Sequence, residues 1–332
     1  MSATSPVRIA TRGSPLALAQ ANAVLALCQE AFPKVPFELR IIKTTGDKLQ
    51  SASLADSNLP KGLFTKEIED ALLREEADLA VHSLKDLPTK LPEGLLLGAT
   101  TPRAEVRDVL VFRDIEFAFA AGAVRAARQN RRAYRPALSV TALPTGAVAA
   151  TSSTRRAAQL LERRPDLKLL PIRGNVGTRL RKLLEQSELD VLILAAAGLQ
   201  RLGGKITPHG TLAGPDFPAG LGASLLPLSE MLPCVGQAAI GIEMRQDDAR
   251  IEPICRALNH PDTRACVEAE RAFLQGMGGG CQLAVAALAE IQNATLHLRA
   301  VSFLRSNPRR GEISGSPAGA AALGEQLAGQ LR

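Results

Sequence analysis

Aromatic side chains are scarce in this chain of 332 residues. It has no tryptophan, one tyrosine (Tyr134) and nine phenylalanines, so that aromatic residues make up 3% of the sequence. Proteins that bind single-stranded nucleic acid commonly stack the bases on aromatic rings. The scarcity argues against that function. The basic run at residues 125–135 could still bind RNA, but it is more typical of a solvated surface.

Cysteine pairs, histidine clusters and long apolar runs are also missing. The five cysteines are widely spaced without a C-x-x-C pair, and the four histidines lie far apart. A disulfide framework or a zinc site would need such pairs or clusters, so we expect neither, and no metal. The sequence shows no apolar segment of signal-peptide or membrane-spanning type. We therefore expect a cytoplasmic protein that does not contact a membrane.

The overall composition is that of a globular protein with a preference for anions. Hydrophobic residues make up 46% and charged residues 22% of the chain, and the net charge is +7. A chain of this length can form two or three domains. The positive charge favours an anionic partner, and a small polyacid would satisfy it as well as a phosphate backbone.

Arginines follow the ends of expected strands between residues 151 and 182. Arg155, Arg156, Arg173 and Arg179 lie near hydroxyl side chains and a Gly-Asn turn. Guanidinium groups bind carboxylates through two parallel hydrogen bonds, and helix N-termini add backbone donors. Any single arginine could belong to a solvated helix face. Four of them after strand ends favour a site for a ligand with many carboxylates.

Strands and helices alternate through most of the chain, which predicts an α/β fold with parallel sheets. Ligands bind outside the carboxyl ends of the strands in such sheets, so two doubly wound domains around a cleft are expected. Segments 117–143 and 203–231 are expected to be long loops or insertions. A small α+β domain is expected at the C-terminus. Strands are expected at 7–10, 37–43, 79–82, 108–112, 147–150, 167–172, 190–194, 283–291 and 295–304, and helices at 15–31, 65–74 and 262–277.

Two residues stand in settings suited to chemistry. Cys281 follows three consecutive glycines, which allow positive φ and close approach of a bulky group to the thiol. The alternative is a structural cysteine beside a flexible loop. Asp86 follows an expected strand in Ser-Leu-Lys-Asp-Leu-Pro, where a carboxylate could form a turn or stabilise a cation.

Several motifs in the same order resemble the porphobilinogen deaminase, or hydroxymethylbilane synthase, family over nearly the whole chain. They include RIATRGSPLALAQA, DLAVHSLKDLPT, TSSTRRAAQL and IRGNVGTRL. GGCQ alone would be weak support, but the longer motifs are specific. The motifs lie at 8–21, 61–73, 78–89, 151–160, 172–180, 194–203, 235–243 and 279–282.

The resemblance implies an enzyme of tetrapyrrole biosynthesis with a covalent dipyrromethane cofactor on Cys281. Four porphobilinogen molecules would be deaminated and joined head to tail onto this primer, and hydroxymethylbilane would be released. The family's catalytic aspartate corresponds to Asp86. Loss of ammonia from porphobilinogen leaves a methylene-pyrrole cation, which a carboxylate can stabilise. Asp86 would also assist the proton transfers.

The resemblance also places the residues that bind the cofactor and the substrate. Each pyrrole carries an acetate and a propionate arm, which accounts for the arginines. The cofactor-binding residues would be Asp47, Ser83, Lys85, Thr151, Ser153, Arg155, Arg156, Arg173 and Cys281. The substrate-binding residues would be Arg12, Lys61, Phe64, Asn175, Arg179 and Arg201.

The family build implies three domains and a monomer. Two periplasmic-binding-protein-like domains would comprise residues 1–103 with 224–244, and 104–223, and the α+β domain that carries the cofactor would comprise 245–332. Hinge motion and the loop at 50–60 would make room for the growing product. The sequence departs from the family at Ala238, where glycine is usual, and in the loop before Lys61.

Two other functions fit parts of the sequence. A non-catalytic anion receptor would also have two α/β domains around a basic cleft, but it would need neither Cys281 nor Asp86. A nucleic-acid-binding module would depend on the basic run at 125–135 and would show steep salt dependence.

Overall fold

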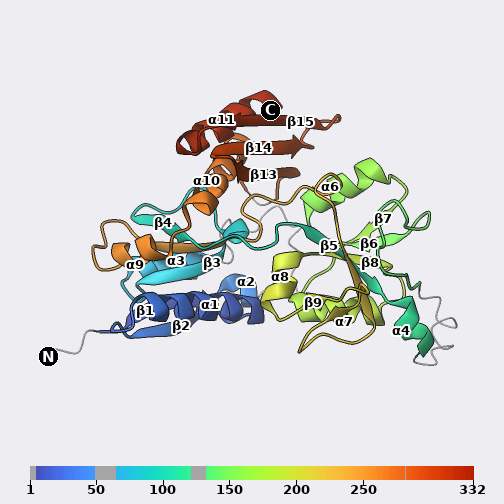
Figure 1. Cartoon of the computed structure of the whole chain (residues 1–332), viewed down its shortest axis with the longest axis horizontal. Helices are drawn as coiled ribbons and strands as arrows, with labels where there is room; N and C mark the ends of the chain where they lie inside the picture. The colour runs from blue at the N-terminus through green and yellow to red at the C-terminus, as the bar shows by residue number, and fades with distance from the viewer. Residues whose placement is uncertain (1–4, 49–64, 121–131, 281) are drawn as a thin grey trace. The chain divides into compact units, whose positions relative to one another are not determined.

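The computed structural model describes residues 5–48, 65–120, 132–280 and 282–332. The chain forms two compact units (Figure 1). The first unit comprises Met1–Ala104 with Cys234–Arg332, and the second comprises Glu105–Pro233. The proposed division into three domains, with its boundaries, stays a prediction.

The first unit contains a five-stranded sheet in the order β2-β1-β3-β12-β4. Strand β1 runs parallel to β2 and β3, whereas β12 runs antiparallel to β3 and β4. The sheet is therefore mixed and not purely parallel as expected. Its strands are β1 (Val7–Arg12), β2 (Phe37–Ile42), β3 (Leu79–Ser83), β4 (Leu95–Thr100) and β12 (Ile240–Arg245).

Helices cover both faces of this sheet. On one face Val24 and Cys28 of α1 (Pro15–Ala31) pack against Ile9 of β1, and α9 (Glu252–Leu258) joins the same core. On the other face α3 (Lys66–Leu73) buries Ile68 and Leu72 against Ala80 of β3. The periodic apolar positions of α1 and α3 thus explain the doubly wound arrangement. The short helix α2 (Thr45–Lys48) follows β2.

The C-terminal part has the expected α+β structure. Strands β13 (Val285–Gln292), β14 (Thr295–Ser302) and β15 (Arg309–Gly315) form an antiparallel sheet. Helices α10 (Pro261–Gly276) and α11 (Ala320–Leu331) pack on it, and they bury Phe273, Leu298 and Leu327 in one core. The short 3₁₀ helix Pro317–Gly319 leads into α11.

The second unit contains a five-stranded sheet in the order β11-β5-β8-β6-β7. Strands β6, β7 and β8 are parallel, whereas β5 is antiparallel to both β8 and β11. The strands are β5 (Asp108–Arg113), β6 (Val148–Ala150), β7 (Lys168–Leu170), β8 (Val191–Ala195) and β11 (Leu221–Leu225). The helices are α4 (Ile115–Ala120), α6 (Thr154–Arg163), α7 (Val176–Glu185) and α8 (Ala196–Arg201).

The expectation of a long loop at 203–231 is wrong. This segment contains β9 (Lys205–Ile206) and β10 (Leu212–Ala213), which form a two-stranded sheet, and β11. A Cβ atom on Gly222 of β11 would lie 2.3 Å from the Phe112 ring. The glycine therefore allows close packing beside an aromatic ring and does not mark a loop. In segment 117–143, residues 117–120 belong to α4 and were wrongly expected to be a loop, whereas residues 132–143 are irregular. Most of the basic run at 125–135 lies outside the described residues.

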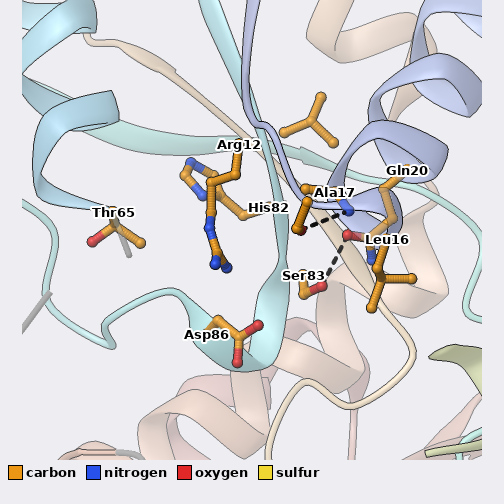
Figure 2. Close-up of a pocket in the computed structure, with 10 residues that line it drawn as sticks. Arg12, Leu16, Ala17, Gln20, Thr65, His82, Ser83 and Asp86 are labelled. Carbon is orange, nitrogen blue, oxygen red and sulfur yellow. Dashed lines mark hydrogen bonds between the residues drawn. The ribbon is translucent and has the colours of Figure 1, made fainter. Parts of the chain in front are cut away.

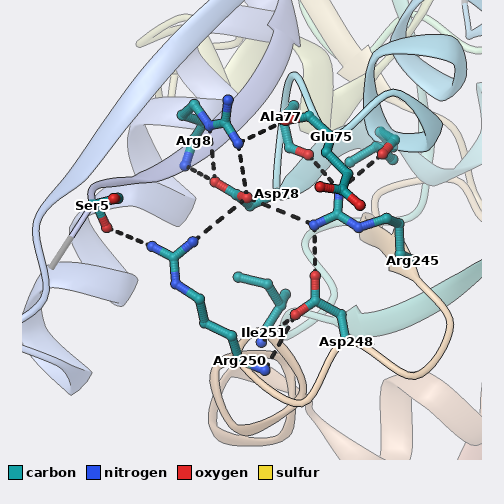
Figure 3. A network of polar contacts seen from close by, with 10 residues as sticks. Ser5, Arg8, Glu75, Ala77, Asp78, Arg245, Asp248, Arg250 and Ile251 are labelled. Atoms are coloured by element: carbon teal, nitrogen blue, oxygen red, sulfur yellow. Dashed lines mark hydrogen bonds and ion pairs between the residues drawn. The ribbon is translucent and has the colours of Figure 1, made fainter.

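An ionic network around Asp78 fixes the start of β3 (Figure 3). The Asp78 carboxylate accepts hydrogen bonds from the backbone N–H and the guanidinium of Arg8, at 2.7 and 3.2 Å. Arg245 and Arg250 each lie 3.7 Å from the same carboxylate. Burial alone would raise the pKa of the Asp78 carboxyl. The hydrogen bonds and the positive charge of Arg8 have the larger effect, so the pKa is lowered. These arginines therefore have a structural partner of opposite charge.

Glu270 of α10 connects several segments of the first unit. Its carboxylate binds the Arg103 guanidinium at 2.6 and 3.0 Å and accepts the backbone N–H groups of Gly236 and Ala289, both at 2.8 Å. The Glu270 side chain is completely buried and that of Arg103 is 11% exposed. A charge so deeply buried needs partners of opposite charge or hydrogen-bond donors. Glu270 finds them in Ala289 of the C-terminal sheet and in Arg103 and Gly236, which lie before and after the second unit in the sequence, so its contacts connect these three segments.

We predict that E270Q destabilises the protein by about 3 kcal/mol, because it leaves the buried Arg103 charge without its counter-ion. Urea unfolding monitored by circular dichroism measures the effect. The control is E290Q, which removes a half-exposed ion pair with Arg299 and should cost less than about 1 kcal/mol. Equal effects of the two variants would contradict the structural role of Glu270.

Candidate active site

A pocket opens in the first unit where β1 and β3 end (Figure 2). Together with the open space at its mouth, it has a volume of about 410 Å³. Both strands are parallel, so the residues that follow them gather at one edge of the sheet. The pocket is lined by Arg12, Ser14, Leu16, Ala17, Gln20, Thr65, Val81, His82, Ser83 and Asp86.

The sequence places Asp86 in the pocket through a tight turn. Ser83 ends β3, and Leu84–Asp86 form one turn of 3₁₀ helix, closed by the Leu87 N–H group donating to the Leu84 carbonyl. Gly236, at φ +70°, lies so close that a Cβ atom there would be 3.2 Å from the Lys85 backbone nitrogen. This contact restricts the turn. Lys85 itself is half-buried in the same turn.

The N-terminus of α1 borders the same pocket. Ser14 caps the helix and accepts the Ala17 N–H group at 3.3 Å. The Ser83 hydroxyl donates to the Gln20 side-chain oxygen at 2.9 Å, which connects β3 with α1. Arg12, the last residue of β1, supplies a positive charge. The pocket thus combines a carboxylate, a guanidinium and helix N-terminal donors.

A second group of expected site residues gathers in the second unit, at the carboxyl edge of β6 and β7. Ser153 caps α6 and Asn175 caps α7, so both helix N-termini lie at this edge. The Ser152 hydroxyl donates to the Ile172 carbonyl at 2.8 Å and accepts the Ile172 N–H group at 3.0 Å, which joins the two strand ends. Two helix N-termini at one edge favour an anion.

Arg155 and Arg156 are bound to a buried aspartate at the start of β5. Their guanidinium groups lie 2.8 and 2.7 Å from the Asp108 carboxylate. Arg155 also donates to the Leu232 carbonyl at 2.6 Å, and Arg156 to the Ile193 carbonyl at 3.0 Å. The two arginines are only 3% and 7% exposed. They therefore anchor the start of α6 to the sheet, a role that the sequence interpretation did not assign to them.

The three other expected site arginines of this unit, Arg173, Arg179 and Arg201, are half-buried. Arg179 donates from Nε to the Gly174 carbonyl at 2.7 Å, which holds its side chain over the turn before α7. Arg173 lies in that turn, directly before Gly174. Burial lowers the pKa of Arg201 to about 10, so the group is still positively charged at neutral pH. Thr151, whose hydroxyl accepts the Ser153 N–H group at 3.1 Å, belongs to the same edge.

Some expected site residues fall outside the described part of the chain. They are Lys61, Phe64 and Cys281, together with the side chain of Asp47 and the loop at 50–60. The three glycines before Cys281 have φ values of +110°, +69° and +100°. The expectation of positive φ in this loop is therefore confirmed. Ala238 also has a positive φ of +70°, so this alanine adopts the backbone conformation usual for glycine.

Comparison with known proteins identifies the family. Residues 7–253 match the family model described as porphobilinogen deaminase, dipyromethane cofactor binding domain, and residues 264–332 match the porphobilinogen deaminase C-terminal domain. The chain belongs to the porphobilinogen deaminase family. This family is that of hydroxymethylbilane synthase, a transferase of tetrapyrrole biosynthesis. The first of the two matched regions is the part of the fold that binds the dipyrromethane cofactor.

Curated relatives agree over nearly the full length. A porphobilinogen deaminase of Desulforudis audaxviator is 44% identical over 98% of this chain and 94% of its own length. One of Paracoccus denitrificans is 43% identical over 99% and 94%. One of Geobacter metallireducens is 44% identical over 89% and 81%. The similarity therefore extends through both units.

None of the helices in residues 5–48, 65–120, 132–280 and 282–332 is long and apolar enough to cross a bilayer. In the same ranges, no three His, Cys, Asp or Glu side chains are grouped as metal ligands.

Sequence reasoning missed three polar residues that the structure places at the sites. Asp108 opens a buried strand, where an acidic residue signals a partner of opposite charge. Gln20 and His82 line the pocket of the first unit. His82 stands in an apolar strand directly before Ser83, and this position was a signal available in the sequence.

We predict that D108N lowers the stability of the second unit by about 3–5 kcal/mol at pH 7, because two buried guanidiniums lose their counter-ion. Burial would raise the pKa of Asp108, but Arg155 and Arg156 outweigh it and the pKa is lowered. The ionised carboxylate therefore stabilises the fold at pH values above about 4, the unfolded pKa, and this contribution is lost as the pH falls toward the folded pKa.

Urea unfolding at several pH values between 7 and 3 measures this contribution. The wild type should lose more stability on acidification than D108N. The exposed Asp216 provides the control, since D216N should follow the wild-type curve. Parallel curves for wild type and D108N would contradict the assignment.

Proposed function

We propose that this protein joins four porphobilinogen molecules head to tail onto a dipyrromethane primer held by Cys281 and releases hydroxymethylbilane. The observation that carries the proposal is the placement of Asp86 in one pocket with Arg12, where β1 and β3 end. Family membership supplies the reaction, and this pocket supplies a carboxylate and a guanidinium for it.

The residues present fit a covalent dipyrromethane. The loop at 278–280, which directly precedes Cys281, has positive φ at each glycine, a conformation that glycine adopts without strain. When bound, the cofactor supplies a pyrrole ring whose free α-carbon is nucleophilic. Ser83, Lys85, Thr151, Ser153, Arg173 and Asp47 are proposed to bind its polar groups and carboxylate arms.

Asp86 is proposed to act on the substrate. Porphobilinogen loses ammonia when its carbon–nitrogen bond breaks, and the electron pair leaves with nitrogen. The methylene-pyrrole cation that remains is stabilised by a nearby carboxylate. The turn at Leu84–Asp86 restricts where the backbone of Asp86 lies, because Gly236 packs against Leu84 and Lys85.

Arginines are proposed to bind the acetate and propionate arms of the substrate and the product. Arg12, Arg179 and Arg201 bind substrate, with Lys61, Phe64 and Asn175 as further contacts. Charge-assisted hydrogen bonds contribute about 1.5–3 kcal/mol each, so one lost arginine would reduce the rate or affinity by about one or two powers of ten. Arg155 and Arg156 are proposed to contribute by fixing the start of α6, because Asp108 holds both.

Porphobilinogen is the proposed partner of a cytoplasmic monomer that does not bind nucleic acid. A non-catalytic anion receptor would need arginines, but it would not need Asp86 in a pocket or a cysteine after three glycines. The receptor and the enzyme therefore differ in whether substrate is consumed.

We predict that D86N keeps the covalent primer but slows turnover at least 100-fold, because the developing cation loses its counter-charge. Release of ammonia from porphobilinogen measures turnover, and intact mass follows the addition of each pyrrole unit. The exposed Glu93 of the same unit provides the matched control, and E93Q should turn over at the wild-type rate. Turnover of D86N within threefold of the wild type would remove Asp86 from the proposed role.

A further inference from the structure

An arginine of α10 binds the chain directly after Asp86. Arg271 donates from Nη1 to the Leu87 carbonyl at 3.2 Å. From Nη2 it donates to the carbonyls of Pro88 and Thr89, at 2.6 and 3.2 Å. One guanidinium thus holds three consecutive carbonyls, because its donors form a rigid planar fork. Arg271 therefore restricts the path of the chain that follows Asp86.

The neighbouring residue of α10 acts on the chain that precedes Asp86. Glu270 accepts the Gly236 N–H group at 2.8 Å. Gly236 packs so closely on the turn that a Cβ atom there would lie 3.2 Å from the Lys85 backbone nitrogen. Two consecutive residues of one helix therefore support the turn, Glu270 through Gly236 before Asp86 and Arg271 directly after it.

The same helix leads into the loop that precedes the proposed primer site. α10 ends at Gly276, and Cys281 follows after a short loop. A Cβ atom on Gly279 of this loop would lie 3.6 Å from the Thr89 hydroxyl. The backbone of the loop therefore lies beside the segment that Arg271 holds.

The helix α10 is attached to the sheet of the first unit without Arg271. About two turns earlier, Arg264 donates to the Leu97 carbonyl of β4 at 2.5 Å. At the start of the helix the His260 N–H group donates to the Thr100 carbonyl at 2.7 Å. What Arg271 adds is a grip on the three carbonyls after the turn.

The proposed reaction depends on where the Asp86 carboxylate lies relative to the anchored primer. Its charge must be close to the methylene-pyrrole cation when this cation meets the free α-carbon of the primer. A displacement of about 1 Å can reduce a rate about 100-fold. The residue sits in a single turn of 3₁₀ helix, and such turns have poor hydrogen-bond geometry of their own. The turn therefore needs support from outside.

We propose that Arg271 positions Asp86 for catalysis by holding the turn to the helix that precedes the primer loop, an inference that rests on the proposed function. Arg271 is a positioning residue, because it acts through backbone carbonyls. It ties the segment that carries the acid to the segment that carries the sulfur anchor. The distance between Asp86 and the anchor is then the same at each condensation, however long the product has become.

The first test compares R271A with R264A in the holoenzyme. Each variant removes an α10 arginine that donates to backbone carbonyls of the first unit, so each should lower the urea midpoint. Only R271A should lower kcat, about 10- to 100-fold, with KM within about threefold and the primer still attached by intact mass. R264A should keep kcat within about threefold of the wild type. R271K keeps the charge but lacks the fork, so its kcat should lie between those of R271A and the wild type.

The second test does not depend on activity. Amide hydrogen exchange followed by mass spectrometry reports how firmly a segment is held. We expect the peptide that covers residues 84–90 to exchange at least about fivefold faster in R271A than in the wild type. The same peptide should exchange at the wild-type rate in R264A.

The third test separates positioning from direct binding of carboxylate arms. Quenched samples analysed by intact mass follow the addition of each pyrrole unit. Every addition uses Asp86, so R271A should slow all of them by the same factor. An arginine that binds the arms of the growing product would slow some additions more than others.

The proposal is overturned by R271A with kcat within threefold of the wild type, or by R264A with an equal loss of kcat, which would reflect stability alone. Unequal slowing of the additions would make Arg271 a ligand of the product instead. If R271A does not fold, R271K decides, and wild-type kcat and exchange in R271K would contradict the role of the fork. Failure of the proposed function is distinct, because wild-type protein would then neither carry a primer nor consume porphobilinogen.

Discussion

Parallel strands end at one edge of their sheet, and this constraint decides where the polar groups of both candidate sites lie. In the first unit β1 ends at Arg12 and β3 at Ser83, and the pocket with Asp86 forms directly after them. In the second unit β6 and β7 each lead into a capped helix N-terminus. The apolar residues of the strands build the cores, so the chemistry is confined to the few residues that follow each strand.

The arginines of this basic chain divide into anchors and candidate ligand-binding groups. Arg8 is held by Asp78, Arg103 by Glu270, and Arg155 and Arg156 by Asp108. Each anchor neutralises a buried carboxylate that would otherwise be too costly to desolvate. Net charge alone therefore overstates the number of arginines that can bind a polycarboxylate, and half-buried residues such as Arg173 and Arg179 are better candidates.

The sequence predicted α1 from the Ser14 cap and the proline that follows it, and it also predicted the apolar strand β3, the helix α10 and the strand-end positions of Arg12, Ser83 and Asp86. It did not predict β11, because Gly222 resembles a loop residue until the Phe112 ring beside it is known. It predicted a strand at 108–112 but not the antiparallel direction of β5, and it did not predict β12; the direction of both strands depends on how the chain returns to each sheet. The pairing of Asp108 with Arg155 and Arg156, and of His82 with Glu243, joins residues 47, 48 and 161 positions apart, which local patterns do not reveal.

The central claim is that Cys281 carries a two-pyrrole primer from which the product grows. The intact mass of freshly purified wild-type protein tests it most directly. The mass should exceed that of the polypeptide by two linked pyrrole units, and C281S should show the mass of the polypeptide alone. An unmodified mass in active wild-type protein, or an excess that persists in C281S, would contradict the account.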